Sequence, residues 1–241
     1  MLDPKARVIM ISGANRGIGL AIARCLHFKG YTLSLGVRDP AKLDGVFADA
    51  HATTLSIHHY DAEVPETGTR WIQDTVSQNG RLDGLVNNAG MYKTVTLEGE
   101  EGRDDEPDLD ALWSVNVKGP LYLTRAAFPH LKASKQGRVI NIASLSGKRV
   151  VGNSLGYGLT KFAVMGLTHQ IRHDGWEHGI RASAVCPSFV SSDMATGITD
   201  MDTAEMTQPE DIAELVATLI ALPNTAAVPE ITVNWRNEGI Y

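Results

Sequence analysis

Short apolar runs alternate with helical patterns along the whole chain, and this alternation limits the possible folds more than any other feature. The alternation has no internal repeat and no linker. Apolar runs of this length are typical of strands buried on both faces. We therefore predict an α/β protein with a doubly wound Rossmann fold, a seven-stranded parallel sheet and helices on both faces, in a single domain over residues 1–241. The expected strands span residues 7–12, 32–37, 54–60, 82–87, 138–143, 181–186 and 230–234.

The helices between these strands follow from apolar periodicity and from their end signals. They are expected over residues 18–29, 65–79, 109–132 and 154–178, and a last helix opens at Pro209. Gly119-Pro120 predicts a bend in the third helix, and Ser154 is a candidate cap for the fourth. Residues 191–208 are polar and lack strong periodicity, so we expect a mobile lid there.

Composition excludes several classes of function. The chain has 241 residues and a net charge of -6, which gives no reason to expect nucleic acid or an anionic membrane as a partner. No apolar run reaches the roughly 18 residues that span a bilayer, and the N-terminus lacks the apolar segment of a secretory signal. Cys25 and Cys186 lie in apolar contexts. We expect two buried free thiols in a cytoplasmic protein.

Chemically informative residues follow the predicted strands. In parallel sheets of this kind, ligands bind beyond the carboxyl ends of the strands, where the strand order reverses. Six residues that each follow a different strand are harder to obtain by chance than one motif, so we expect a single site at that edge of the sheet. The residues that each follow a strand are Gly13, Arg38, Asp61, Asn88, Ser144 and Pro187.

A glycine-rich turn follows the first strand and precedes a helix, with the spacing Gly13-x-x-x-Gly17-x-Gly19. Glycines allow a pyrophosphate to approach the backbone closely, and the N-terminus of a helix favours negative charge. The alternative is a tight turn with no ligand. The flanking strand and helix favour the nucleotide interpretation.

Tyr157 and Lys161 are four residues apart in a predicted helix and so share one face. A nearby ammonium favours the phenolate and lowers a tyrosine pKa, which is ordinarily about 10. Ser144 can reach back across a loop as a hydroxyl donor, which completes a proton-transfer site for a substrate oxygen. Alone the pair is a weak signal, since a half-buried tyrosine beside a surface lysine is common.

Several motifs together resemble those of the short-chain dehydrogenase/reductase family, over about residues 7–234. They lie in the family's order, and the gap from Ser144 to Tyr157 matches as well. The resemblance implies an oxidoreductase that uses a nicotinamide dinucleotide. The motifs are Gly13-x-x-x-Gly17-Ile18-Gly19, Asn87-Asn88-Ala89-Gly90, Asn116, Ser144, Tyr157-x-x-x-Lys161 and the turn at Pro187.

The resemblance assigns catalytic roles to four of these residues. Tyr157 would exchange a proton with the substrate oxygen, and Ser144 would hydrogen-bond that oxygen and stabilise its developing charge. Lys161 would lower the pKa of Tyr157 and hold the ribose of the nicotinamide. Asn116 would position a water that links Lys161 to solvent.

The remaining implied residues bind the dinucleotide. Asn88, Ala89 and Gly90 would pack along the adenosine, and Asp61 would hydrogen-bond the adenine. Residues 187–190 would cover the nicotinamide, with the Val190 backbone on its carboxamide. The expected cofactor-binding residues are Gly13, Asn15, Arg16, Gly17, Ile18, Gly19, Arg38, Asp61, Asn88, Ala89, Gly90, Tyr157, Lys161, Pro187, Val190 and Ser192.

The end of the second strand predicts NADP rather than NAD. NAD-binding folds place a carboxylate there for the ribose 2′-hydroxyl, whereas this chain has Val37 followed by Arg38. Arg16 in the glycine turn can reach the same region, and two guanidinium groups suit a phosphate. The alternative is that both arginines are solvated and that Asp39 serves NAD. Asp39 starts the next helix, where capping is the favoured role.

Two positions depart from the family pattern. Ser188 stands where glycine usually follows Pro187, and Val233-Asn-Trp-Arg-Asn replaces the usual aspartate-glycine-glycine ending. His169 and His173 share a helix face, but a third ligand with suitable spacing is missing, so we expect no metal site.

We expect a cytoplasmic NADP-dependent reductase of a small carbonyl compound, assembled as a homodimer or homotetramer. One alternative is an alcohol or sugar dehydrogenase that works oxidatively. Another is a non-catalytic dinucleotide sensor, which would have no need of all four catalytic residues. The substrate itself is not readable from the sequence. The pocket is expected to be mostly apolar and lined by Met91, Tyr92, Leu145, Ser146, Val151, Asn153 and Phe189.

Overall fold

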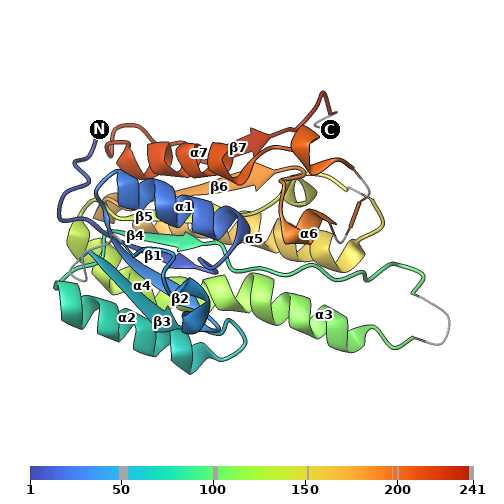
Figure 1. Cartoon of the computed structure of the whole chain (residues 1–241), viewed down its shortest axis with the longest axis horizontal. Coiled ribbons are helices and arrows are strands. Elements are labelled where there is room, and N and C mark those ends of the chain that lie inside the picture. The colour runs from blue at the N-terminus through green and yellow to red at the C-terminus, as the bar shows by residue number, and fades with distance from the viewer. Residues whose placement is uncertain (49–53, 100–102, 151, 197, 200, 239–241) are drawn as a thin grey trace.

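The sheet is the organising element of the fold (Figure 1). The computed structural model describes residues 1–48, 54–99, 103–150, 152–196, 198–199 and 201–238. Seven parallel strands lie in the order β3-β2-β1-β4-β5-β6-β7, which confirms the predicted doubly wound sheet. The order reverses between β1 and β4, where a ligand crevice is expected. The strands are β1 Val8–Ser12, β2 Thr32–Val37, β3 Leu55–His59, β4 Gly84–Asn87, β5 Arg138–Ile142, β6 Arg181–Pro187 and β7 Glu230–Val233.

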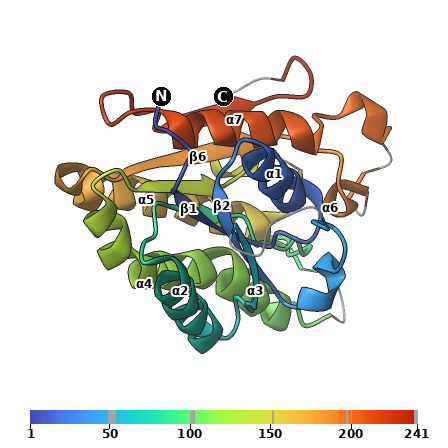
Figure 2. The ribbon, with the colours of Figure 1, turned by 60° about the vertical axis from the view of Figure 1, so that its left-hand side comes forward.

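Helices cover both faces of the sheet (Figures 1 and 2). Ile9 and Ile11 of β1 belong to the core under α1 and α7, whereas Met10 belongs to the core on the side of α2 and α4. This alternation follows from the period of two along a strand. The longer helices are α1 Gly17–Phe28, α2 Pro65–Asn79, α3 Glu106–Trp113, α4 Gly119–Ser134, α5 Leu155–Gly175 and α7 Pro209–Ala221.

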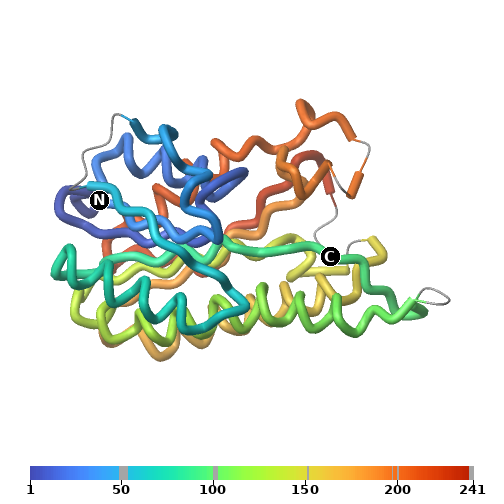
Figure 3. The backbone as a smooth tube through the Cα atoms, turned by 60° about the horizontal axis from the view of Figure 1, so that its bottom comes forward, coloured from blue at the N-terminus to red at the C-terminus, as the bar shows by residue number. Residues whose placement is uncertain are grey.

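The predicted bend at Gly119-Pro120 takes a different form in the structure. A π-helical turn, Ser114–Lys118, joins α3 to α4, and the Gly119 N–H donates to the carbonyl of Ser114. Pro120 lies in the first turn of α4, where its missing N–H is not needed. Figure 3 shows α3 and α4 running on from one another along one side of the molecule. The irregularity therefore precedes the glycine.

The segment expected to be an unstructured lid contains short helical turns. Asp193–Thr196 forms α6, and Thr203–Glu205 forms a 3-10 turn. Its two ends are joined, because the Ser191 N–H donates to the Thr207 carbonyl at 2.9 Å. Residues 197 and 200 lie outside the described residues. Closure of this segment over ligands stays a prediction.

Three smaller expectations can be compared with the structure. Ser154 occupies the cap position of α5, but its hydroxyl donates to the Lys93 carbonyl at 3.4 Å and does not cap the helix. Cys186 is buried as expected, whereas Cys25 is only partly buried and its thiol lies 3.4 Å from Glu214 Oε1. Over the described residues, the structure has no helix with the length and apolar character needed to cross a membrane.

Candidate active site

The glycine turn after β1 is packed so tightly that it leaves no room for side chains at Gly13 and Gly19. A Cβ on Gly19 would lie 2.3 Å from the Gly13 carbonyl oxygen, and Gly13 itself has φ +67°. The Asn88 amide donates to the Ser12 and Gly13 carbonyls at 3.0 and 3.1 Å and so ties this turn to β4. The N-cap residue of α1 is Arg16, and its side chain makes no capping hydrogen bond. The first N–H groups of α1 are left for an anion, which fits the pyrophosphate of a dinucleotide.

A cleft with a volume of about 1060 Å³ runs along the carboxyl ends of the strands. It is at the upper end of the roughly 300–1,000 Å³ usual for small-molecule sites, as a dinucleotide together with a substrate requires. Of the predicted residues, Gly19 and Asn116 do not line it. The predicted residues that do are Gly13, Asn15, Arg16, Gly17, Ile18, Arg38, Asp61, Asn88, Ala89, Gly90, Ser144, Tyr157, Lys161, Pro187, Val190 and Ser192.

The proton-transfer residues meet in the middle of this cleft. Tyr157 and Lys161 lie on one face of α5, and the Lys161 ammonium is 5.4 Å from the centre of the Tyr157 ring. Lys161 donates to the Ile142 carbonyl at 3.0 Å, at the end of β5. Ser144 follows the same strand, and its hydroxyl accepts from the Ser146 N–H at 3.1 Å.

Burial controls the electrostatics of this group. It raises the pKa of Tyr157 to about 12, while the hydrogen bond with Ser144 acts in the opposite direction. Burial also lowers the pKa of Lys161 to about 8. In this arrangement the Lys161 ammonium donates to the Ile142 carbonyl, and the loss of solvation is the largest influence on the tyrosine pKa. The lowering of that pKa by Lys161 stays a prediction. Tyr157 is protonated at neutral pH and is set up to donate.

Asn116 lies in the π turn and is almost completely buried. Its Nδ2 donates to the Met91 carbonyl at 2.9 Å and to Thr160 Oγ1 at 3.1 Å, and its Oδ1 accepts from the Met91 N–H at 2.9 Å. Both ends of the amide thus bind protein groups. The side chain fixes the segment after β4 against α5, whereas the resemblance implied that Asn116 positions a water.

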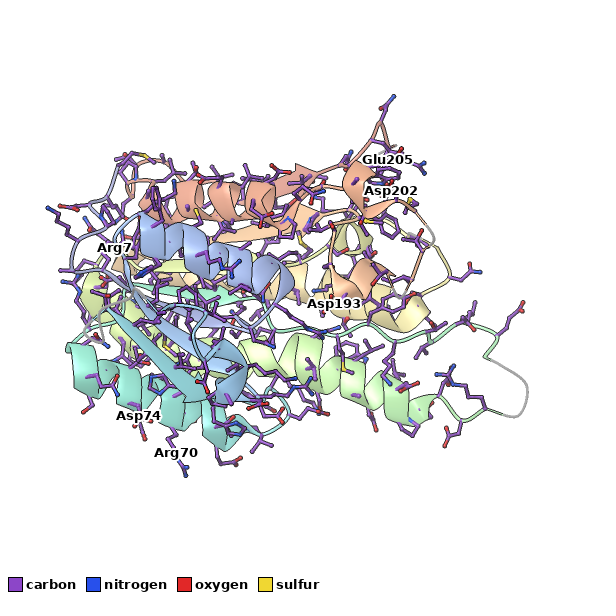
Figure 4. All side chains as sticks on the ribbon, viewed as in Figure 1. Arg7, Arg70, Asp74, Asp193, Asp202 and Glu205 are labelled. Carbon is purple, nitrogen blue, oxygen red and sulfur yellow. The ribbon has the colours of Figure 1, made fainter. Side chains whose placement is uncertain are left out.

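The two arginines expected to select NADP differ in their surroundings. Arg16 pairs with Asp193 of α6 at 2.9 Å, and both side chains are well exposed. Figure 4 labels Asp193 beside α6. Within the part of the chain that the structure describes, the exposed Arg38 guanidinium has no hydrogen-bonding partner. Asp39 caps the 3-10 turn Pro40–Leu43 by accepting from the Ala41 N–H, as predicted. Both arginines line the cleft, as does Asp193, which pairs with Arg16.

Tyr92 also lines the cleft and packs against Tyr157 with ring centres 5.2 Å apart. The expected substrate-side residues line the cleft, except that Val151 lies outside the described residues. The sequence did not single out Met194 and Ile198, which also line it. The sequence signal that could have identified them is that they are apolar residues within the polar segment 191–208.

The histidines considered as metal ligands bind carboxylates. His169 Nε2 lies 2.9 Å from Glu230 Oε1, and His173 Nδ1 lies 3.0 Å from Asp174 Oδ1. Across the described ranges, no three His, Cys, Asp or Glu side chains form a group that could hold a metal ion.

Comparisons with known proteins agree with this geometry. A family model described as short chain dehydrogenase matches residues 7–203. The agropine synthesis reductase of Rhizobium rhizogenes is 40% identical over 234 residues, which are 97% of this chain but 54% of that protein, so the chain spans about half the length of this curated relative.

Two solved structures have the same fold over nearly their full length. A metagenomic short-chain oxidoreductase in complex with NADP has a TM-score of 0.81 and 30% identity, and the match covers 96% of this chain and 98% of that one. An alcohol dehydrogenase from the archaeon Thermococcus sibiricus, in complex with 5-hydroxy-NADP, has a TM-score of 0.84 and 27% identity over 94% of this chain and 95% of that one.

Proposed function

Because the chain belongs to the short-chain dehydrogenase family and is therefore an NAD(P)-dependent oxidoreductase, we propose that it reduces a small carbonyl compound with NADPH. The observation that carries this proposal is the cluster of Tyr157, Ser144 and Lys161 on the wall of a cleft that also contains a glycine turn suited to pyrophosphate. A bound nicotinamide supplies the hydride, and the protein supplies placement and the proton.

The roles of the residues follow from their surroundings. Tyr157 holds its proton at neutral pH and donates it to the substrate oxygen. The Ser144 hydroxyl donates to the same oxygen as negative charge develops on it. Lys161 supplies a positive charge beside the phenolate that remains, and its low pKa lets it pass a proton on near neutral pH. Asn116 holds Met91 against α5 and so keeps the cleft wall in place.

The preference for NADPH rests on Arg38 and Arg16. Both side chains line the cleft, Arg38 at the end of β2 and Arg16 in the glycine turn. The position where NAD-binding folds have a carboxylate is occupied by Val37. Charge-assisted hydrogen bonds from guanidinium to a 2′-phosphate are the strong kind. The two solved relatives described above carry NADP and 5-hydroxy-NADP, which supports the same choice.

The test is to incubate the pure protein with NADPH or NADH and a panel of aldehydes and ketones, following absorbance at 340 nm. Turnover with NADPH, lost in Tyr157→Phe, is the expected result. Exposed Arg70→Ala on α2 serves as a control, because Arg70 does not line the cleft. Binding of NADPH without turnover of any carbonyl or alcohol would favour the sensor alternative instead.

The oxidative direction is the second candidate, and the alcohol dehydrogenase among the similar structures favours it. The reductase named among the relatives favours reduction. The raised pKa keeps Tyr157 protonated at neutral pH, which is the form that a proton donor needs. Measuring the reverse reaction with NADP⁺ and an alcohol panel at pH 7 and pH 9 decides between them.

We also propose a homodimer or homotetramer. Leu155, Leu159 and Phe162 follow one another along one side of α5 and remain exposed, and Tyr122 on α4 is exposed as well. Large exposed apolar side chains on paired long helices suit burial against a second copy. Light scattering at micromolar concentration should give a multiple of 26.0 kDa. Phe162→Glu should lower that mass, and a wild-type monomer would refute the proposal.

A further inference from the structure

Two sequence features have no role in the reaction described above, and the structure brings them together. Ser188 directly follows β6, and Glu238 lies five residues beyond the end of β7. The Ser188 hydroxyl donates to Glu238 Oε1 at 2.9 Å. The two residues are far apart in sequence, so this contact ties the segment after β7 to the turn that lines the cleft beyond β6.

The same carboxylate oxygen also faces a second loop. Arg149 Nη2 lies 3.9 Å from Glu238 Oε1, and Arg149 belongs to the loop that follows Ser144. Ser188 and Phe189 from one loop, and Ser146 from the other, all line the cleft. Glu238 therefore stands behind both loops and contacts each of them without itself lining the cleft.

The placement of Glu238 is unfavourable for stability alone. Its side chain is 9% exposed, and its Oε2 accepts no hydrogen bond from any of the described residues. Oε1 has partners in Ser188 and Arg149, but Oε2 loses hydration in this partly buried position without gaining a hydrogen bond from the described residues. A residue that served only folding would be better replaced by a neutral one. The contacts of Glu238 thus point to a role in holding the two loops.

We infer that Glu238 is a positioning residue: through Ser188 and Arg149 it sets the distance between the turn at residues 187–190 and the loop that begins at Ser144. The serine hydroxyl is essential to this arrangement, because a glycine could not reach the carboxylate. The inference rests on the proposed function, since it matters to catalysis only if these loops flank the reacting atoms.

The kinetic test compares Ser188→Ala, Glu238→Ala and the double variant. Each single variant should lower kcat/KM about tenfold, as for a lost hydrogen bond to a charged group. The double variant should lose no more than Glu238→Ala alone, because Glu238→Ala already removes the contact with Ser188. Glu238→Gln should retain most activity, since its amide oxygen still accepts from Ser188. Arg236→Ala, an exposed neighbour on the same segment, is the matched control.

A purely structural role predicts different results. It would lower the melting temperature of Glu238→Ala in proportion to the loss of activity, whereas positioning leaves that temperature within a degree or two of the Arg236→Ala control. Losses that add in the double variant, or full activity in Glu238→Ala, would overturn the inference.

Hydrogen exchange tests the contact independently of the reaction. Amide exchange in peptides from residues 145–149 and 187–190 should accelerate in Glu238→Ala and not in Arg236→Ala. Unchanged exchange in both peptides would overturn the inference whatever the wild-type activity is. A wild type that neither binds NADPH nor reduces any carbonyl would refute the proposed function, and the exchange data would still decide whether Glu238 holds the loops.

Discussion

Replacing Lys161 with methionine should remove activity and at the same time stabilise the protein. Lys161 is 7% exposed, and burial lowers its pKa from 10.5 to about 8. A lowering from 10.5 to about 8 corresponds to roughly 3.5 kcal/mol of destabilisation of the charged form at neutral pH, at about 1.4 kcal/mol per pKa unit. Methionine loses the hydrogen bond from the ammonium to the Ile142 carbonyl, which costs about 1.5 kcal/mol, as for a bond to a charged group. The net gain is about 2 kcal/mol.

The assay is thermal unfolding of Lys161→Met against wild type, with exposed Lys5→Met as the control. A gain of about 2 kcal/mol raises the melting temperature of a domain of this size by roughly 4–8 °C. The folded pKa is below the unfolded one, so the unfolded state binds more protons and wild-type stability rises between about pH 8 and 10.5. The advantage of the variant should therefore shrink over that range. A variant less stable than wild type at pH 7, or a constant advantage, would refute this reasoning.

Three other outcomes follow from the site. Tyr157→Phe should abolish turnover and leave NADPH binding by fluorescence nearly intact, because only the proton donor is lost; retention of more than a few per cent of activity would exclude Tyr157 as the acid. Arg38→Ala should raise the Michaelis constant for NADPH about tenfold to a hundredfold and barely change that for NADH, and equal losses with both cofactors would count against the assignment. Reductive kcat/KM should fall as pH rises above about 8, where Lys161 loses its charge while Tyr157 stays protonated; a flat profile to pH 10 would contradict this.

The order of strands and helices was predictable from the sequence because it depends on local periodicity. The seven strands and the placement of residues such as Gly13 and Ser144 at the carboxyl edge agree with the structure. The structure begins β4 at Gly84, two residues after the predicted start. The sequence could not show this difference, because Leu82 is as apolar as the residues within the strand. The short helix α6 was missed because four residues are too few to show a helical period.

Features that depend on packing between distant segments could not be predicted. The pKa of Tyr157 is set by how deeply the ring is enclosed, and neither burial nor the partner of the Lys161 ammonium can be read from their spacing. The contact between Ser188 and Glu238 joins residues with a separation of 50 positions. Ser188 and the stretch at residues 233–237 stood out in the sequence but Glu238 did not, and only the fold shows that Ser188 and Glu238 meet.

The π turn between α3 and α4 makes the site sensitive to changes in chain length. The Ser114–Lys118 turn contains one residue more than a regular α-helix would use. Deleting a single residue there would restore an ordinary helix, yet it would rotate everything on one side of the deletion by about 100° relative to the other. Asn116 would then turn away from Met91 and Thr160. A one-codon deletion in this stretch should consequently be more harmful than almost any substitution in it, even though the helix itself would become more regular.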